Sequence, residues 1–353
     1  MEIDIAKIDP NFKISEAFGR EDVVLRSCLE APFSIHGVTH DGEGFCRLPK
    51  KLAESVNPSI AALSRHTAGG RVRFRTDSPF VALHLVSPTL GRMSHFAATG
   101  SAGLDLYADG VYKKTVIPPP DKTSYSGIIE LGERKMRDIE INFPLYSRVT
   151  DIEIGLLPDA VVEAPKPYRY ATPAVFYGSS ITQGGCASRP GTCYQGHISR
   201  YFDLDYINLG FSGNAKGEIA LAEYIASLPV SVFFMDYDNN PPTVQHLRET
   251  HEPFFLAVRK AHPDIPVIMM SRPKPFSMLC DWEIERREVI RTTYENARSR
   301  GDKNVYFIDG ETLTALSGTE GMVDGCHPTD LGFFSEARAL IELCEREGIL
   351  KRP

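Results

Sequence analysis

The chain has 353 residues, of which 42% are hydrophobic and 24% charged, a composition typical of globular proteins and a length that accommodates two domains. The formal net charge is -7 and no run of Lys or Arg occurs, which argues against a nucleic-acid partner. No apolar run approaches the roughly 18 residues of a membrane helix, so we expect no membrane partner either. The composition does not indicate an oligomeric state.

The beginning of the chain, "MEIDIAKIDPNFKI", lacks the basic and apolar regions of a signal peptide. This favours a cytoplasmic location, with a secreted or periplasmic protein whose signal peptide has been removed as the alternative. Seven scattered cysteines, an odd number, disfavour a disulfide framework. Cys186, Cys193 and His197 suggest zinc, but no CxxC pair accompanies them, so we expect ordinary thiols and no metal or other cofactor.

Residues 1–165 show the patterns of short strands. Polar and apolar residues alternate or form short apolar runs at 71–77, 80–86, 138–143 and 149–157. The segment 104–117 has the pattern of a hairpin whose turn is Asp109-Gly110. We therefore predict an antiparallel β-sandwich over residues 1–165, although "GFCRLPKKLAESV" within it indicates neither helix nor strand.

Residues 158–174 contain four prolines and are predicted to form a linker. Beyond the linker, segments of helical periodicity alternate with apolar runs at 174–178, 205–211, 230–237, 265–271 and 304–309. Strands that are apolar throughout are covered on both faces, as in a parallel sheet. We therefore predict a flavodoxin-like, doubly wound parallel sheet over residues 171–353, in which Pro253 breaks or kinks one helix.

Polar segments punctuated by glycine or proline follow these strands. "GSSITQGG" follows the first, "SGNAKGE" the second and "DNNPPT" the third, and "DGCHPTDLG" lies beyond the fifth. Because the carboxyl ends of parallel strands meet at one edge of a sheet, these segments should lie close together. They offer a serine hydroxyl, backbone N–H groups, an amide, a histidine and an aspartate. These are the groups that nucleophilic acyl transfer requires.

In this order the segments resemble the four sequence blocks of the SGNH or GDSL hydrolases. "GSSIT" resembles the block with the nucleophilic serine, which corresponds to Ser180. Ser179 stands where the family usually has an aspartate, so its hydroxyl is the alternative nucleophile. "GLDLY" at 103–107 resembles the signature of the β-rich GxDLY domain that precedes the hydrolase domain in one branch of the family.

The resemblance implies a role for each matching residue. "DGCH" resembles the final block and would complete a catalytic triad of Ser180, His327 and Asp324. "NLGFSGN" and "DYDNN" resemble the second and third blocks. They imply an oxyanion hole made by the N–H groups of Ser180 and Gly213 and by the side chain of Asn240, with Asn239 as the alternative amide.

Each segment also has a structural alternative when it is taken alone. "DGCHPTDLG" could begin a helix with Asp and Thr caps, and "FSGN" could be a turn that needs glycine. "GSSITQGG" lacks both the lysine of a P-loop and the glycine spacing of a dinucleotide site. Four blocks in the family's order, each at a strand end, favour the hydrolase.

Three further residues are candidates for substrate binding. Arg189 and Arg272 follow the first and fourth strands and could bind a substrate carboxylate or sugar hydroxyls. Trp282, the single tryptophan, could stack on a sugar ring, although we favour core packing for it. We treat His95 as a surface or core histidine, and we expect "GLDLY" to stabilise the sandwich or the domain interface.

The resemblance implies a serine esterase that removes a small acyl group, such as acetyl, from a carbohydrate or another polar alcohol. An acyltransferase with the same triad is the first alternative, because no residue here separates hydrolysis from transfer. A carbohydrate-binding protein with an inactive hydrolase domain is the second alternative. It is disfavoured because all of the family's chemical groups are present. The expected partner is a small-molecule or carbohydrate ester.

Overall fold

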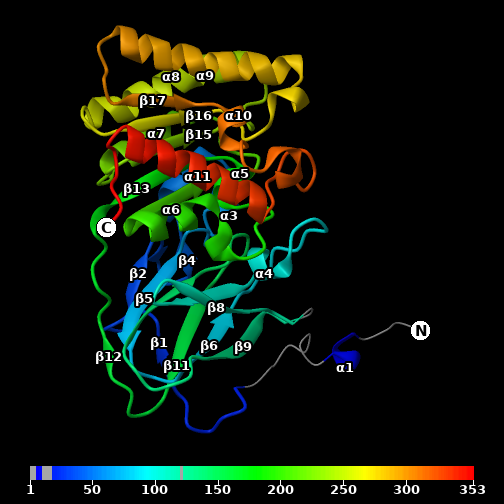
Figure 1. The fold of residues 1–353 in the computed structure, drawn as a ribbon, viewed down its shortest axis with the longest axis vertical. Coiled ribbons are helices and arrows are strands. Elements are labelled where there is room, and N and C mark those ends of the chain that lie inside the picture. Colours follow the sequence, from blue (N-terminus) through cyan, green and yellow to red (C-terminus); the bar gives the residue numbers. More distant parts are fainter. Residues whose placement is uncertain (1–4, 10–17, 120–121) are drawn as a thin grey trace.

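The computed structural model describes residues 5–9, 18–119 and 122–353. An antiparallel β-rich part lies at the bottom of the view in Figure 1, and an α/β part built on a parallel sheet lies above it. Residues 1–4, 10–17 and 120–121, all within the predicted N-terminal range 1–165, lie outside the described residues. A short helix, α1 (Ile5–Ile8), stands apart at the N-terminal end.

Two antiparallel sheets form the β-rich part, with strand orders β1-β11-β6-β9 and β12-β5-β10-β7-β8, and β2 is paired to β5. Apolar side chains from both sheets, among them Phe74, Leu83, Leu106 and Ile154, form one core between them. The predicted sandwich is thus confirmed. The strands are β1 (Val24–Ser27), β2 (Ser34–His36), β5 (Arg71–Thr76), β6 (Phe80–Val86), β7 (Leu104–Ala108), β8 (Val111–Val116), β9 (Ser124–Glu130), β10 (Arg137–Asn142), β11 (Asp151–Leu156) and β12 (Val162–Glu163).

The hairpin between β7 and β8 has the predicted turn. Asp109 and Gly110 have φ angles of 52° and 75°, the left-handed values that a two-residue type I′ turn needs at both positions. Two smaller elements complete this part: the paired strands β3 (Thr39–His40) and β4 (Phe45–Cys46), and the helix α4 (Ala98–Ser101).

The segment whose pattern was ambiguous, residues 44–56, contains β4 and the short helix α2 (Lys50–Val56), and a second short helix, α3 (Pro58–Leu63), follows it. The side chains of the helices do not pack in the sandwich: Leu48, Ala53 and Ile60 belong to a hydrophobic cluster of the α/β part. Hydrophobic contacts therefore cross the boundary between the ranges 1–165 and 171–353, and those domain limits stay a prediction.

The α/β part has one parallel sheet in the order β14-β13-β15-β16-β17, which confirms the doubly wound, flavodoxin-like prediction. Its strands are β13 (Tyr170–Gly178), β14 (Leu204–Gly210), β15 (Phe233–Asp236), β16 (Val267–Met270) and β17 (Val305–Ile308). Its helices are α5 (Ser180–Gln183), α6 (Tyr194–Phe202), α7 (Ile219–Ser227), α8 (Val244–Ala261), α9 (Asp281–Ser299), α10 (Gly310–Leu313) and α11 (Asp330–Arg346).

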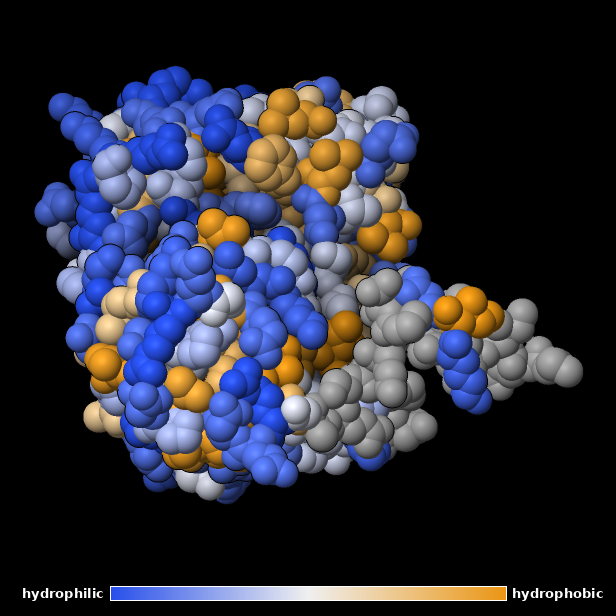
Figure 2. All heavy atoms as spheres, turned by 60° about the horizontal axis from the view of Figure 1, so that its bottom comes forward, coloured by the Kyte–Doolittle hydropathy of each residue, from blue (hydrophilic) through white to orange (hydrophobic). Residues whose placement is uncertain are grey.

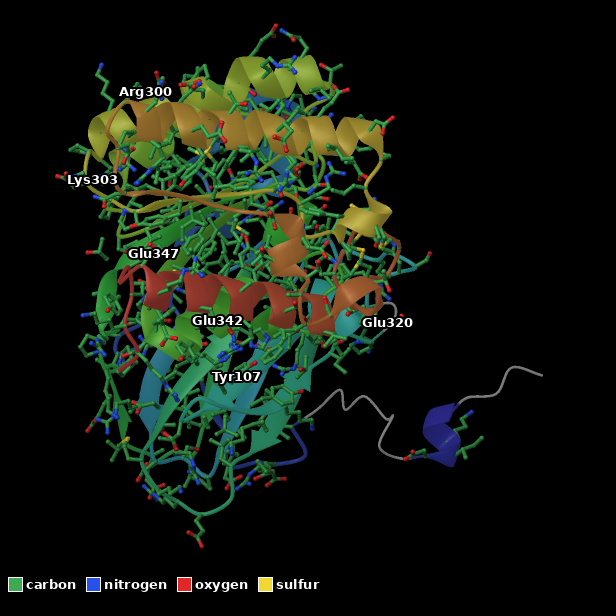
Figure 3. The ribbon with its side chains drawn as sticks, turned by 45° about the horizontal axis from the view of Figure 1, so that its top comes forward. Tyr107, Arg300, Lys303, Glu320, Glu342 and Glu347 are labelled. Atoms are coloured by element: carbon green, nitrogen blue, oxygen red, sulfur yellow. The ribbon has the colours of Figure 1, made fainter. Side chains whose placement is uncertain are left out.

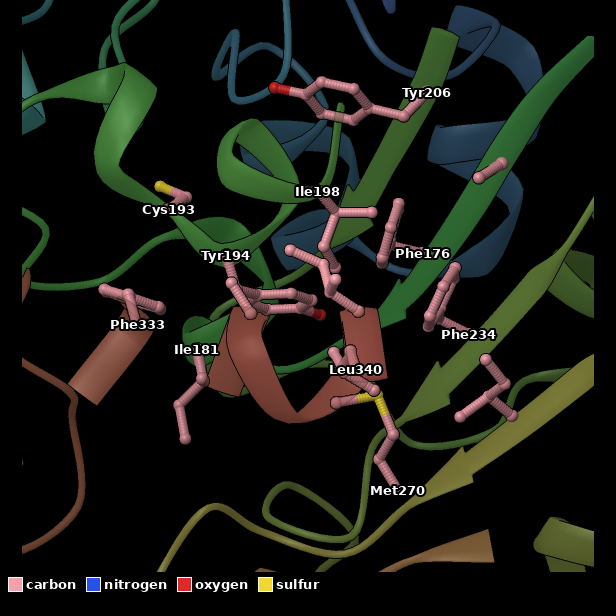
Figure 4. Close-up of a cluster of buried hydrophobic side chains, with 14 of the residues drawn as sticks. Phe176, Ile181, Cys193, Tyr194, Ile198, Tyr206, Phe234, Met270, Phe333 and Leu340 are labelled. Carbon is pink, nitrogen blue, oxygen red and sulfur yellow. The ribbon is translucent and has the colours of Figure 1, made fainter. Parts of the chain in front are cut away.

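Separate hydrophobic clusters cover the two faces of this sheet. On one face, Phe176 and Phe234 stack with ring centroids 4.2 Å apart, and Tyr194 of α6 and Leu340 of α11 join them (Figure 4). Side chains of α7, α8 and α9 pack on the opposite face. Pro253 lies inside α8, which continues through it, so of the predicted break or kink the break does not occur. Its neighbours Phe254 and Phe255 are buried and hold the helix against the sheet.

The surface on the face shown in Figure 2 is mainly hydrophilic, with hydrophobic side chains in separate patches. Within residues 5–9, 18–119 and 122–353, no helix combines the length and the apolar character that a bilayer crossing requires.

Arg47 is a buried arginine that connects the two parts of the chain. The guanidinium of Arg47 donates hydrogen bonds of 2.5–3.3 Å to the carbonyls of Leu63, His66, Asn208 and Gly210. Two of these acceptors lie within the N-terminal range 1–165, at the end of α3 and just after it, and two lie on β14. Buried carbonyl groups need hydrogen-bond donors, and the Arg47 side chain supplies them to both parts of the chain.

Replacing this arginine tests the interface. In Arg47→Ala the four carbonyls lose their donor in a buried site, and we expect the free energy of unfolding to fall on the order of 3 kcal/mol. Urea denaturation measures the loss. The control is Arg26→Ala, at an exposed position of β1. Equal stability of the two variants would show that the interface does not depend on these bonds.

Candidate functional site

The candidate site lies at the carboxyl edge of the parallel sheet. The loops after β13, β14 and β15 meet there, as the doubly wound topology requires. The Gln183 side chain joins two of them, because its Oε1 accepts from the Ser212 N–H at 3.0 Å. Asn240 joins the next pair, because its Oδ1 accepts from the Ala215 N–H at 3.2 Å. Three of the four predicted blocks are thus adjacent in space.

The turn from β13 into α5 positions the two adjacent serines differently. A Cβ at Gly178 would lie 2.1 Å from the Asp236 carbonyl oxygen, so only glycine allows this close approach. Ser179 is fully buried, and its hydroxyl caps α5 by accepting from the Ile181 N–H at 3.2 Å. Ser180, the first residue of α5, is free of this capping role.

A chain of hydrogen bonds joins Ser180 to the "DGCH" segment. His327 Nε2 lies 2.9 Å from Ser180 Oγ, although the two residues are 147 positions apart in the sequence. His327 Nδ1 lies 2.8 Å from Asp324 Oδ2. A carboxylate can only accept, so Nδ1 carries the proton. Nε2 is then free to accept from the serine hydroxyl.

Asp324 is held as a carboxylate. Its Oδ1 accepts from the N–H groups of Cys326 and His327 at 3.0 Å and 2.8 Å. Burial alone raises the pKa of Asp324, but these N–H groups and the imidazole outweigh it and lower that pKa to about 2. The carboxylate is therefore ionised at neutral pH and can stabilise a positive charge on the neighbouring ring.

The predicted oxyanion donors lie in the loops that meet at this edge of the sheet. Gly213 has a left-handed φ of 68°, and the space that its missing side chain leaves is open. No described residue accepts from its N–H. The Ser180 N–H stands at the start of α5, where backbone donors lack helical partners. The Oδ1 of Asn240 is engaged with Ala215, which leaves its NH₂ group to bind a ligand.

The Arg189 side chain is not free to bind a substrate at the carboxyl edge of the sheet. Its guanidinium bonds to Asp105 Oδ2 at 3.2 Å and to the Tyr107 hydroxyl, and it lies 3.9 Å from the Tyr112 ring centroid. Figure 3 shows Tyr107 where the sandwich strands meet the C-terminal helices. The buried Asp105 also accepts from the Gly191 N–H at 2.8 Å. The "GLDLY" segment thus stabilises the interface between the two parts, as expected. Its Asp105 and Tyr107 hold the Arg189 side chain there.

Arg272 and Trp282, the other two candidates for substrate binding, lie in contact with each other in the segment that follows β16. The Arg272 side chain is 7% exposed and lies between Asp238, at 3.6 Å, and Glu283. Trp282 is 48% exposed, so the preference for core packing was wrong. Its ring lies 4.8 Å from the Arg272 guanidinium and 5.1 Å from that of Arg286. The side chain covers two arginines instead of filling a core.

Two residues of the β-rich part reach this site, although no motif in the sequence pointed to them. His95, treated above as a surface or core histidine, has its Nε2 3.9 Å from Asp324 Oδ2 and its ring centroid 5.8 Å from that of His327. The Tyr146 hydroxyl donates to the Ser180 carbonyl at 3.1 Å. Neither residue belongs to a sequence block of the family. Finding them would have required knowing which loops of the β-rich part face the edge of the parallel sheet.

One group in the described part of the chain could hold a metal ion. The ligand atoms of His95, Cys186 and His327 all lie within 4.8 Å of one another. The combination of Cys186 with Cys193 and His197 does not form such a group among these residues.

Comparisons with known proteins agree with the fold. Residues 171–344 match the family model of GDSL-like lipases and acylhydrolases, and residues 27–162 match that of the GxDLY N-terminus of SGNH-hydrolase-type esterases. No curated protein matches the sequence significantly.

Several solved structures resemble this one along almost their whole length. A proposed GDSL-like lipase from Bacteroides ovatus ATCC 8483 is 28% identical with a TM-score of 0.84, and the match covers 94% of this chain and 99% of that one. The salicylyl-acyltransferase SsfX3 of a tetracycline biosynthetic pathway is 21% identical with a TM-score of 0.78, covering 95% and 100%. The acetyl xylan esterase Est2A from Butyrivibrio proteoclasticus is 14% identical with a TM-score of 0.59, covering 93% and 100%.

The two family models together span most of the chain. One matches the β-rich part and the other matches the α/β part. The protein belongs to the GDSL-like lipase/acylhydrolase family, in the branch that carries a GxDLY domain, and it is an ester-hydrolysing enzyme.

Proposed function

We propose that the protein is a serine esterase that hydrolyses a small acyl ester, such as an acetyl ester, of a carbohydrate or another polar alcohol. The observation that carries this proposal is the hydrogen-bond chain from Ser180 Oγ through the His327 ring to Asp324. A serine hydroxyl is a weak nucleophile at neutral pH unless a base lies within hydrogen-bond reach, and here the imidazole does.

The reaction begins when Ser180 Oγ attacks the ester carbonyl carbon and His327 Nε2 takes the hydroxyl proton. The Asp324 carboxylate stabilises the imidazolium that forms. The carbonyl oxygen becomes an oxyanion, and we assign its binding to the N–H groups of Ser180 and Gly213 and to the Asn240 amide. His327 then protonates the leaving alcohol as its C–O bond breaks. A water molecule, deprotonated by the same ring, attacks the acyl-serine, and the ring returns that proton to Ser180 Oγ as its bond to the acyl carbon breaks and the acid is released.

The substrate class rests on fold-level analogy. The neighbours include the acetyl xylan esterase and family two carbohydrate esterases, one of them in complex with cellohexaose. Support from this chain comes from the β-rich part, which brings His95 and Tyr146 beside the triad. The β-rich part would thereby form one wall of the substrate cleft.

The neighbour SsfX3 is an acyltransferase, and transfer would use the same residues. In that reaction an alcohol, instead of water, attacks the acyl-serine. Adding a second alcohol to the assay separates the two reactions. An esterase mainly releases acid from the acyl-enzyme, whereas a transferase mainly forms the new ester.

Removing the nucleophile tests the mechanism. In Ser180→Ala we expect ester hydrolysis to fall on the order of 10⁴-fold or more without loss of folding, and His327→Ala should be comparably damaging because triad members act as a unit. Turnover of short p-nitrophenyl esters measures the loss, and labelling by a fluorophosphonate probe reports the serine itself. The matched control is Ser212→Ala, in the next loop. Near wild-type turnover by Ser180→Ala would refute the assignment.

The neighbouring serine should behave differently. Since the Ser179 hydroxyl caps α5, Ser179→Ala should lose about 1 kcal/mol of stability but keep its fluorophosphonate labelling. Denaturation and labelling are measured on the same preparation. Loss of labelling in a folded Ser179→Ala, together with labelling of Ser180→Ala, would transfer the nucleophile to Ser179.

The amide of the oxyanion hole is tested by a pair of variants. Asn240→Ala should lower kcat about 100-fold with a smaller change in KM, because its donor acts on the developing oxyanion. Asn239→Ala is the matched comparison, since its buried Nδ2 has no partner in the described structure. If Asn239→Ala has the larger effect on kcat, Asn239 is the oxyanion donor.

A panel of acetylated sugars and alcohols, with the acyl chain lengthened step by step, tests the substrate class. We expect acetyl esters of sugars to give the highest kcat/KM. A preference for long acyl chains on apolar alcohols would contradict the carbohydrate assignment while leaving the triad intact.

A further inference from the structure

We propose that His95, Cys186 and His327 form a binding site for a thiophilic divalent cation, of which Zn²⁺ fits best, and that metal bound there inhibits the enzyme. The inhibitory effect rests on the proposed function of His327 as the general base. The binding site itself does not, because it depends only on the three side chains.

The geometry of the three side chains brings this site close to completion. Their ligand atoms lie within 4.8 Å of one another, and the two imidazole ring centroids are 5.8 Å apart. Around a tetrahedral Zn²⁺ with bonds of about 2.0–2.3 Å, ligand atoms are roughly 3.3–3.7 Å apart. The ligands must therefore close by about 1 Å. The His95 side chain is 44% exposed, so it can reorient at little cost in packing.

The chemistry of the ligands selects the ion. Two imidazoles and one thiolate favour Zn²⁺ over Mg²⁺ or Ca²⁺, which prefer oxygen ligands. Three protein ligands leave a fourth position for water. The Asp324 carboxylate lies next to both rings, with Oδ2 2.8 Å from His327 Nδ1 and 3.9 Å from His95 Nε2. Its negative charge stabilises a cation at this place.

Metal binding and catalysis compete for the same ring. Both nitrogens of His327 are already engaged, Nδ1 with Asp324 and Nε2 with Ser180. Whichever nitrogen binds the metal must give up its present partner. The loss of either hydrogen bond interrupts the path by which the serine proton leaves. Zinc should therefore act as an inhibitor that a chelator reverses.

Cys186 offers a clean way to remove one ligand. Its φ is 75°, a left-handed value that is rare for residues other than glycine. Cys186→Gly therefore deletes the thiol while relieving the backbone of a conformation that side chains disfavour. His95→Ala removes a ligand contributed by the other part of the chain. Cys280→Ser is a matched control, since Cys280 is an exposed thiol outside the cluster.

The binding site is tested with Co²⁺ in place of Zn²⁺, because cobalt gives a thiolate charge-transfer band in the near ultraviolet. Purified, metal-free protein should show this band and bind one equivalent of Co²⁺. Cys186→Gly should lose the band, and His95→Ala should weaken binding at least ~10-fold. Cys280→Ser should match the wild type. No band in the wild type, or an unchanged band in Cys186→Gly, would overturn the site. So would a band that is lost in Cys326→Ser instead.

The inhibitory effect is measured separately, as the Zn²⁺ concentration that halves each variant's own metal-free esterase rate. We expect that concentration to rise at least ~10-fold in Cys186→Gly and His95→Ala and to stay unchanged in Cys280→Ser. Cobalt ligation by all three residues without inhibition by Zn²⁺ would overturn the effect on catalysis. An absence of esterase activity in the metal-free wild type would instead refute the proposed function, while the cobalt band still decides the site.

Discussion

The candidate site depends on how helix α5 is anchored, because this helix would not be stable in isolation. Helix α5 has four residues, far fewer than an isolated helix needs in water, so its position comes from tertiary contacts. Thr182 Oγ1 donates to Asp236 Oδ2 at 2.8 Å, and the Thr182 carbonyl accepts from Asn208 Nδ2 at 2.7 Å. The Gln183 side chain bonds to the Leu145 carbonyl and to the Ser212 N–H. These bonds tie the helix to β14, to β15 and to the β-rich part.

This anchoring explains why the β-rich part is more than an appendage. Through Leu145 and Tyr146 it contacts the helix that carries Ser180, and through Arg47 it supplies donors to the end of β14. Asp105 and Tyr107 hold the Arg189 segment that follows α5. A change at this interface would therefore affect the position of Ser180, the proposed nucleophile, and the two parts are best understood as one unit.

Much of the fold was readable from local patterns, because strand periodicity and turn chemistry are set by neighbouring residues. The predicted range 80–86 coincides with β6, and Asp109-Gly110 forms the expected turn. The blocks at the strand ends could be found because the topology of a parallel sheet gathers them. His95, the exposure of Trp282 and the packing of Leu48 on the α/β part could not be predicted. Each depends on how two distant surfaces meet, which no local pattern records.

The exposure of the site matters both for its proposed chemistry and for its proposed inhibition by metal ions. The side chains of His327 and Asp324 are 23% and 35% exposed, so solvent reaches the proposed catalytic pair. The same exposure admits cations to a place where a base must keep a free lone pair. A histidine from the second part of the chain and a thiol held at a left-handed backbone position stand beside that lone pair. The ring that we propose as the general base is thus also a proposed metal ligand, and under these two proposals the free metal concentration decides which role it plays.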